Sequence, residues 1–172
     1  MHKRFALEAV MIAIYGQLLM PDRPVEYYIP YSTVLELYDF RTDEQPLMPD
    51  PHEDEHVRTK IDEMIRFFEE PLNRKKIERA LTAPWRKASL LVNDLVTFQV
   101  VYAIDNAQYG EHLDPIETEL VLTGMMEKIP ILTDQLDFID KVIEAEIPVQ
   151  VFDIEDYEYA LELPDAETID DL

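Results

Sequence analysis

The chain has 172 residues, of which 47% are hydrophobic and 30% charged, and it contains no cysteine. This length suits one domain with a sizeable core, the apolar content argues against a disordered chain, and the lack of cysteine excludes disulfides, thiolate metal sites and cysteine nucleophiles. The net charge of -22, from 37 acidic and 15 basic side chains, opposes binding to nucleic acids or anionic membranes unless basic residues cluster. No run approaches the ~20 apolar residues of a membrane span, so we expect a cytoplasmic protein and no membrane association.

The N-terminal third begins with a long apolar stretch. Residues 5–20 are almost wholly apolar, which favours either a buried helix or a short strand that turns into one. Residues 25–29, flanked by prolines, have strand character. Ser32 or Thr33 is expected to cap the helix that follows.

Two later helices are predicted from the same start signal, an Asp-Pro pair with a glutamate two residues after the proline. The first begins at Asp50 and runs to about residue 70, and the second begins at Asp114 and runs through residue 126. A basic helix is expected between them, over residues 72–82. Residues 85–107 form the longest helical candidate, and their apolar side chains cover so much of the circumference that we place this helix at the centre.

The C-terminal part predicts a parallel sheet. Short apolar runs at 129–133 and 147–152 flank a predicted helix over 134–145, and strand, helix and strand with short connections make a βαβ unit. We therefore predict a helix-rich α/β fold with a small, at least partly parallel sheet. Residues 1–163 are expected to form a single domain, and the acidic residues 164–172 a frayed tail.

One short motif resembles a zinc site. His52, Glu53 and His56 match the pattern His-Glu-x-x-His, whose histidines share one helix face and can hold zinc. Here the pattern falls on the first turn of a predicted helix, where capping and the helix dipole already explain acidic residues. Adventitious metal binding at the surface is the preferred interpretation.

Acidic residues beside apolar runs give a second candidate site. Hard divalent cations take oxygen ligands, and two-metal nucleases gather carboxylates at the ends of parallel strands. Asp134 and Asp137 follow the predicted strand 129–133, at the edge where α/β sheets place ligands, and Glu36 follows the earlier strand. Asp94 is expected inside the central helix, where a buried acid needs a partner or a role. Each acid also has a plain structural interpretation, as a helix cap or a solvent-facing side chain.

The segments Tyr31-Ser-Thr-Val-Leu-Glu-Leu, Asn93-Asp-Leu-Val and Ile131-Leu-Thr-Asp-Gln-Leu-Asp-Phe resemble three successive acidic motifs of PIN-domain ribonucleases. Residues 5–14 stand where that family has its opening strand and helix. The resemblance implies that a cluster of acids surrounds Mg²⁺ or Mn²⁺ and activates water to cut RNA, namely Glu8, Glu36, Asp94 and Asp134. The chain departs from the family in having Glu8 where the opening aspartate is usual and an extra helix at 115–127.

Two functions therefore remain open. The preferred one is an acidic interaction or regulatory protein with a protein partner, because the opening aspartate is missing and residues 144–172 hold eleven acids and no lysine or arginine. The alternative is a PIN-like ribonuclease with metal ligands Glu36, Asp94, Asp134 and Asp137. RNA would then bind through the basic cluster Arg74, Lys75, Lys76 and Arg79. The oligomeric state is left open.

Overall fold

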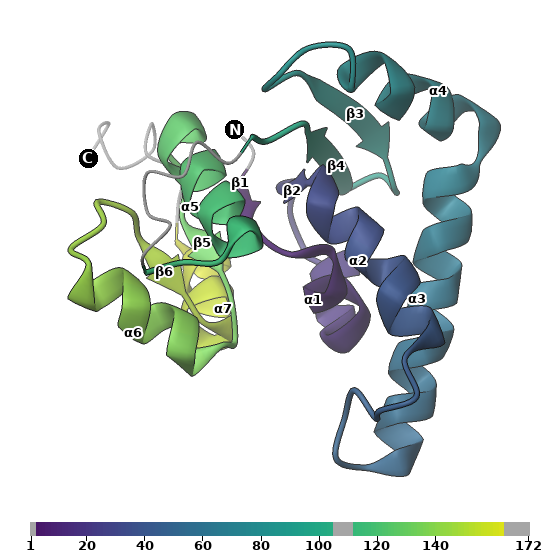
Figure 1. Cartoon of the computed structure of the whole chain (residues 1–172), viewed down its shortest axis with the longest axis horizontal. Coiled ribbons are helices and arrows are strands. Elements are labelled where there is room, and N and C mark those ends of the chain that lie inside the picture. Colours follow the sequence, from purple (N-terminus) through teal and green to yellow (C-terminus); the bar gives the residue numbers. More distant parts are fainter. Residues whose placement is uncertain (1–2, 105–111, 164–172) are drawn as a thin grey trace.

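The computed structural model describes residues 3–104 and 112–163. The strands of this part are β1 (Lys3–Ala6), β2 (Val25–Pro30), β3 (Lys87–Leu91), β4 (Val96–Val101), β5 (Ile131–Leu132) and β6 (Val151–Phe152). Its helices are α1 (Ala9–Ile14), the 3₁₀ helix η1 (Gly16–Leu19), α2 (Tyr31–Thr42), α3 (Pro51–Glu69), α4 (Pro71–Ala80), α5 (Pro115–Glu127), α6 (Leu136–Glu144) and α7 (Ile154–Glu162). The fold is α/β and rich in helix, as the sequence predicts (Figure 1).

The strands form one sheet in the order β3-β4-β2-β1-β5-β6. Strand β1 pairs in parallel with both β2 and β5, and parallel pairing continues from β2 to β4 and from β5 to β6. Strand β3 runs antiparallel to β4 at the edge. The predicted parallel pair near the C-terminus, connected by a helix, is therefore confirmed.

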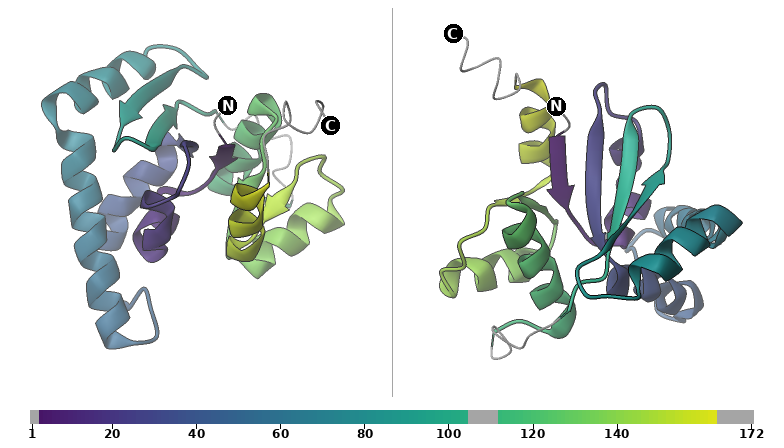
Figure 2. Two further views of the ribbon diagram at one scale, coloured as in Figure 1. Left: turned by 180° about the vertical axis from the view of Figure 1, so that it is seen from behind. Right: turned by 90° about the horizontal axis from the view of Figure 1, so that it is seen from above.

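Helices cover both faces of this sheet. Because neighbouring strand residues point to opposite faces, Phe5 and Tyr27 join an apolar cluster with α1 to α4 and α7, whereas Ala6 and Tyr28 join a second cluster with α5 and α6. Figure 2 shows the α5–α6 pair and the α2–α4 group on opposite sides of the molecule. The core is thus divided into two apolar layers by the sheet.

The local start signals for helices are largely confirmed. Asp50 accepts a hydrogen bond from the backbone of His52 at the start of α3, and Asp114 and Glu117 form a reciprocal capping box at the start of α5. The sequence leaves open whether residues 5–20 form one buried helix or a short strand that turns into a helix. The structure has the second arrangement, with β1 followed by α1. The expected cap of α2 by Ser32 or Thr33 is wrong. Helix α2 begins at Tyr31, and its N-cap residue is Pro30.

The predicted central helix over residues 85–107 is wrong, because its described part forms the hairpin of β3 and β4. Strand β3 alternates exposed and buried side chains, with Ala88 and Leu90 buried, which is the period of a strand. Strand β4 is rich in β-branched residues, which favour strands. Asn93 closes the turn because its Oδ1 accepts hydrogen bonds from the backbone amides of Leu95 and Val96, both at 2.9 Å.

Among the described residues, none of the helices combines the length and the apolar character that crossing a bilayer requires. Helix α7, which the sequence analysis does not predict, starts with a capping box formed by Asp153 and Asp156. The tail at 164–172, which we expect to fray, lies outside the described residues, as do residues 105–107 of the predicted central helix.

Phe98 of β4 provides a test of where the core lies. Its side chain is 2% exposed and its ring lies 5.7 Å from that of Phe67, edge to face. Phe98→Ala should lower the free energy of unfolding by about 3–5 kcal/mol, since both transfer energy and a cavity are lost. Leu91→Ala, on a 69% exposed side chain of the same hairpin, should cost less than about 1 kcal/mol in urea unfolding. If both variants lost the same free energy of unfolding, Phe98 would not be buried in the core as described.

Candidate functional site

The candidate site begins with two acids that follow neighbouring parallel strands. Glu8 comes two residues after β1 and is 8% exposed, and Asp134 comes two residues after β5. The Nε2 group of Gln135 donates a hydrogen bond to Glu8 Oε1 at 3.2 Å, and the Tyr15 hydroxyl donates one to Asp134 Oδ2 at 2.8 Å. The parallel pairing of β1 with β5 therefore brings both carboxylates to the same edge of the sheet.

Glu36 reaches this edge from α2, which starts directly after β2. The start of α2 is tied to that of α1 by Thr33, whose Oγ1 accepts from the Ala9 amide at 3.1 Å and donates to the Pro30 carbonyl at 2.8 Å. Glu36 is half-buried, and its Oε1 is a buried atom with no hydrogen-bond partner among the described residues. A buried oxygen without a partner is uncommon in folded proteins and calls for an explanation, such as a bound ion.

Asp114 adds a fourth acid from the other helical layer. As the N-cap of α5, it accepts a hydrogen bond from the Glu117 amide at 2.7 Å. Helix α5 is tied to α2 by a hydrogen bond from the Ser32 hydroxyl to Glu119. Helix α5 therefore meets α2 at the same edge of the sheet.

We call Glu8, Glu36, Asp114 and Asp134 the carboxyl-edge cluster. Burial, together with the charges of Glu36, Asp114 and Asp134, raises the pKa of Glu8 to about 7. Burial also raises the pKa of Glu36 to about 7, with Asp114 as the strongest of the charges that contribute. Two of the four carboxyls thus resist ionisation near neutral pH, and an added positive charge would relieve their repulsion.

Next to the cluster, Glu117 is 7% exposed and neutralised by a neighbour. Lys141 of α6 donates from Nζ to Glu117 Oε1 at 3.0 Å, and this hydrogen bond raises the pKa of Lys141. The ion pair joins α6 to α5, and the charge of Asp114 also acts on Lys141.

Three of the acids expected at the site, Glu8, Glu36 and Asp134, lie at this edge, but Asp94 does not. Asp94 is exposed in the turn that leads into β4, not buried inside a central helix as predicted. Val96 at the start of β4 pairs with Val25 at the start of β2, so Asp94 lies where the parallel strands begin. The opposite ends of these strands carry the cluster.

Asp137, the other expected ligand, lies in the first turn of α6, is exposed, and is among the charges that act on Lys141. Asp114 takes the place that the sequence analysis gave to Asp94. The signal for it was present, because a helix that follows a parallel strand starts at the carboxyl edge of the sheet. The wrong assignment of residues 85–107 as helix concealed that signal.

Within residues 3–104 and 112–163, no group of three or more His, Asp or Glu side chains is arranged to hold a metal ion as it stands. This includes the two histidines of the zinc-like pattern, His52 and His56, which are exposed on the first turns of α3. The carboxylates of the cluster would have to move closer together to share a cation.

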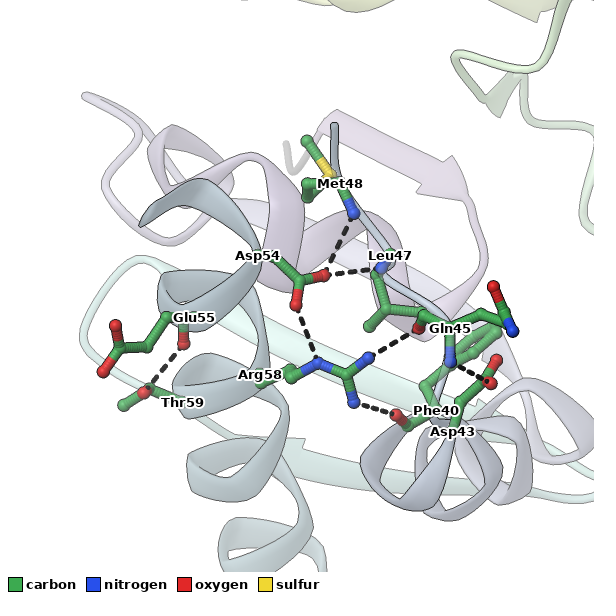
Figure 3. A network of polar contacts seen from close by, with 9 residues as sticks. All are labelled: Phe40, Asp43, Gln45, Leu47, Met48, Asp54, Glu55, Arg58 and Thr59. Carbon is green, nitrogen blue, oxygen red and sulfur yellow. Dashed lines mark hydrogen bonds and ion pairs between the residues drawn. The ribbon is translucent and has the colours of Figure 1, made fainter. Parts of the chain in front are cut away.

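The start of α3 instead anchors the preceding loop (Figure 3). Asp54 accepts from the backbone amides of Leu47 and Met48 and from Arg58 Nε, the last at 2.9 Å. Arg58 also donates to the carbonyl of Gln45 at 2.7 Å and to that of Phe40. Asp54, one of the acidic residues between the two histidines of the zinc-like pattern, therefore has a structural role.

The predicted basic cluster lies on α4, where all four members are exposed: Arg74, Lys75, Lys76 and Arg79. Arg74 lines a cavity of about 260 Å³ between α2, α3 and α4, together with Tyr31 and Tyr38. Tyr31 is the first residue of α2, the helix that carries Glu36. One helix thus connects the basic surface with the carboxyl-edge cluster.

Stability should depend on pH through Glu8. Its pKa of about 7 in the folded protein exceeds its ordinary value of 4.5, so the folded state binds the proton more tightly. The free energy of unfolding should therefore fall as pH rises from about 4.5 to about 7, by about 3 kcal/mol for this group. Glu8→Gln keeps the oxygen that accepts from Gln135 but cannot ionise. It should match the wild type at about pH 5 and exceed its stability by roughly 2–3 kcal/mol at about pH 8.

Asp94→Asn provides the matched control, since it removes one exposed negative charge at the opposite edge. Its stability relative to the wild type should show no comparable change over this pH range in urea unfolding. If the advantage of Glu8→Gln did not grow with pH, Glu8 would not be a buried acid held near other negative charges.

Comparison of the chain with known proteins finds no counterpart. No protein-family model matches it, and neither does any curated protein or any solved structure. Support for a function therefore comes from the carboxyl-edge cluster and its surroundings.

Proposed function

We propose that the protein is a divalent-cation-dependent ribonuclease with a PIN-like site, and that the carboxyl-edge cluster holds the cation. The supporting observation is that acids from four separate segments lie close enough for the charges of Glu36, Asp114 and Asp134 to act on Glu8, at the point where the strand order reverses. The chain runs from β1 through β2 to β4 on one side and returns to β5 on the other side of β1. Open α/β sheets bind ligands at this switch point, outside the carboxyl ends of the strands.

The residues present suit Mg²⁺ or Mn²⁺. Both are hard cations that take carboxylate oxygens as ligands, and the cluster offers four carboxylates. Glu36 Oε1 is a buried acceptor with no hydrogen-bond partner in the described part of the chain, and a cation would satisfy it. Binding would also offset the charge repulsion that, in addition to burial, raises the pKa of Glu8 and Glu36, which gives the carboxylates a reason to approach one another.

A bound cation of this kind supplies Lewis-acid activation of water and of a phosphodiester. The side chains of the protein hold and orient the ligands: Gln135 fixes Glu8, and Tyr15 fixes Asp134. In the hydrolysis, water adds to phosphorus, the bond to one ester oxygen breaks, and that oxygen leaves as a ribose hydroxyl. The carboxyl-edge cluster thus needs no residue that reacts covalently.

The exposed basic residues of α4 support a nucleic-acid substrate. Arg74 lines the cavity together with Tyr31, and Lys75, Lys76 and Arg79 belong to the same helix. Aromatic and arginine side chains together suit single-stranded RNA. The chain as a whole has a net charge of -22, which repels the RNA backbone, so we expect RNA to bind at the basic residues of α4.

The direct test is cleavage of a labelled single-stranded RNA in millimolar Mn²⁺. The wild type should cut the RNA and lose activity with EDTA, and Glu36→Gln or Asp114→Asn should reduce the rate by about 100-fold or more. Asp94→Asn makes the same chemical change as Asp114→Asn but at the opposite edge of the sheet, so its rate should stay near that of the wild type.

Two results would contradict the proposal. One is the absence of Mn²⁺-dependent cleavage by a folded wild-type protein. The other is cleavage that Glu36→Gln and Asp114→Asn leave unchanged, which would assign the activity to another part of the chain or to a contaminant.

A further inference from the structure

Helix α6 carries more apolar surface than its packing uses. Phe138 and Val142 are 2% and 4% exposed and point into the core with α5. Leu136 and Ile143 of the same helix remain 74% and 67% exposed. With Ile139 they occupy positions i, i+3 and i+7, which form one stripe along a helix. Such a stripe on a surface indicates an interaction site.

A groove runs beside this stripe. It encloses about 390 Å³ between α6 and the segment that leads into β6, and its walls include Ile139, Ile143, Ile147, Val149 and Val151. Strand β6 is the last strand of the sheet on this side. The groove is thus apolar along its floor and open at the edge of the fold.

Exposed acids accompany the stripe and the groove. We call them the acidic rim: Glu146 lines the groove, and Asp137, Asp140 and Glu144 are exposed on the helix that carries the stripe. Lys141, which also belongs to α6, is paired with Glu117 of α5 and interacts with Asp137, so α6 has one lysine beside several exposed acids. We use the name α6 groove for the whole surface, which comprises the apolar stripe of α6, the cavity beside it and these exposed acids.

We propose that the α6 groove binds a basic amphipathic helix of another protein. The stripe at i, i+3 and i+7 matches the apolar face of a helix laid along it, and the acidic rim matches flanking lysine or arginine residues. A second copy of this chain fits poorly, because it would place one acidic rim against another in a molecule of net charge -22. This inference is independent of the ribonuclease proposal, and the site is built from other residues.

The test uses a synthetic helical peptide of about 18 residues, with leucine at i, i+3 and i+7 and lysine on the other faces. Binding to the full chain is measured by calorimetry at physiological salt, beside a scrambled peptide of the same composition. Ile143→Glu should weaken binding about tenfold or more, as loss of a central anchor does. Leu72→Glu is the matched control, because Leu72 is an exposed leucine of α4, 64% exposed, and this variant should bind as the wild type does.

The two variants also separate apolar docking from charge attraction. Ile143→Glu adds a negative charge, so binding by charge alone would become stronger in that variant. The proposal is overturned if the wild type does not bind the ordered peptide more tightly than the scrambled one, or if both variants bind equally. It is also overturned if sedimentation shows a wild-type dimer that Ile143→Glu dissociates, because a second copy would then occupy the groove.

Discussion

Strand β1 pairs in parallel with β2 on one side and with β5 on the other, and the candidate site takes its position from this pairing. The contact with β5 is short, with Ala6 opposite Ile131 and the Ala6 amide bonded to the Pro130 carbonyl at 2.9 Å. It is nevertheless what sets Glu8 beside the segment of Asp134. Helices that start after neighbouring strands then bring Glu36 and Asp114 to the same edge.

The arrangement has an energetic consequence. Glutamine would fill the same space as Glu8 or Glu36 without charge, so the buried Glu8 and the half-buried Glu36 cost stability that the apolar layers on both faces of the sheet must offset. Groups with raised pKa values are frequent at functional sites, because the function requires ionisable groups there that the stability of the fold does not require. The partnerless Glu36 oxygen belongs to the same pattern. Both features are explained together if a cation binds at this edge.

Much of the fold could be predicted from sequence because its signals are local. The Asp-Pro starts of α3 and α5 and the short strands near residues 131 and 151 depend on neighbouring residues. The hairpin of β3 and β4 could not be recognised by apolar content alone, because the segment is apolar enough to suit a buried helix. The strand period is instead visible in the alternation of both strands, with Val96 and Phe98 buried and Thr97 and Gln99 half-buried. The helix predicted over residues 85–107 puts Asp94 in a core that it does not enter, and leaves Asp114 as a helix cap only.

The most direct test of this account is a crystal structure of the protein grown at neutral pH with Mn²⁺, with the ion located by its anomalous scattering. The account predicts an ion at the carboxyl edge, bound by Glu36 Oε1 and by at least one more carboxylate from Glu8, Asp114 or Asp134. A structure without an ion at this edge, in which Glu36 Oε1 is instead hydrogen-bonded to a protein group, would contradict it.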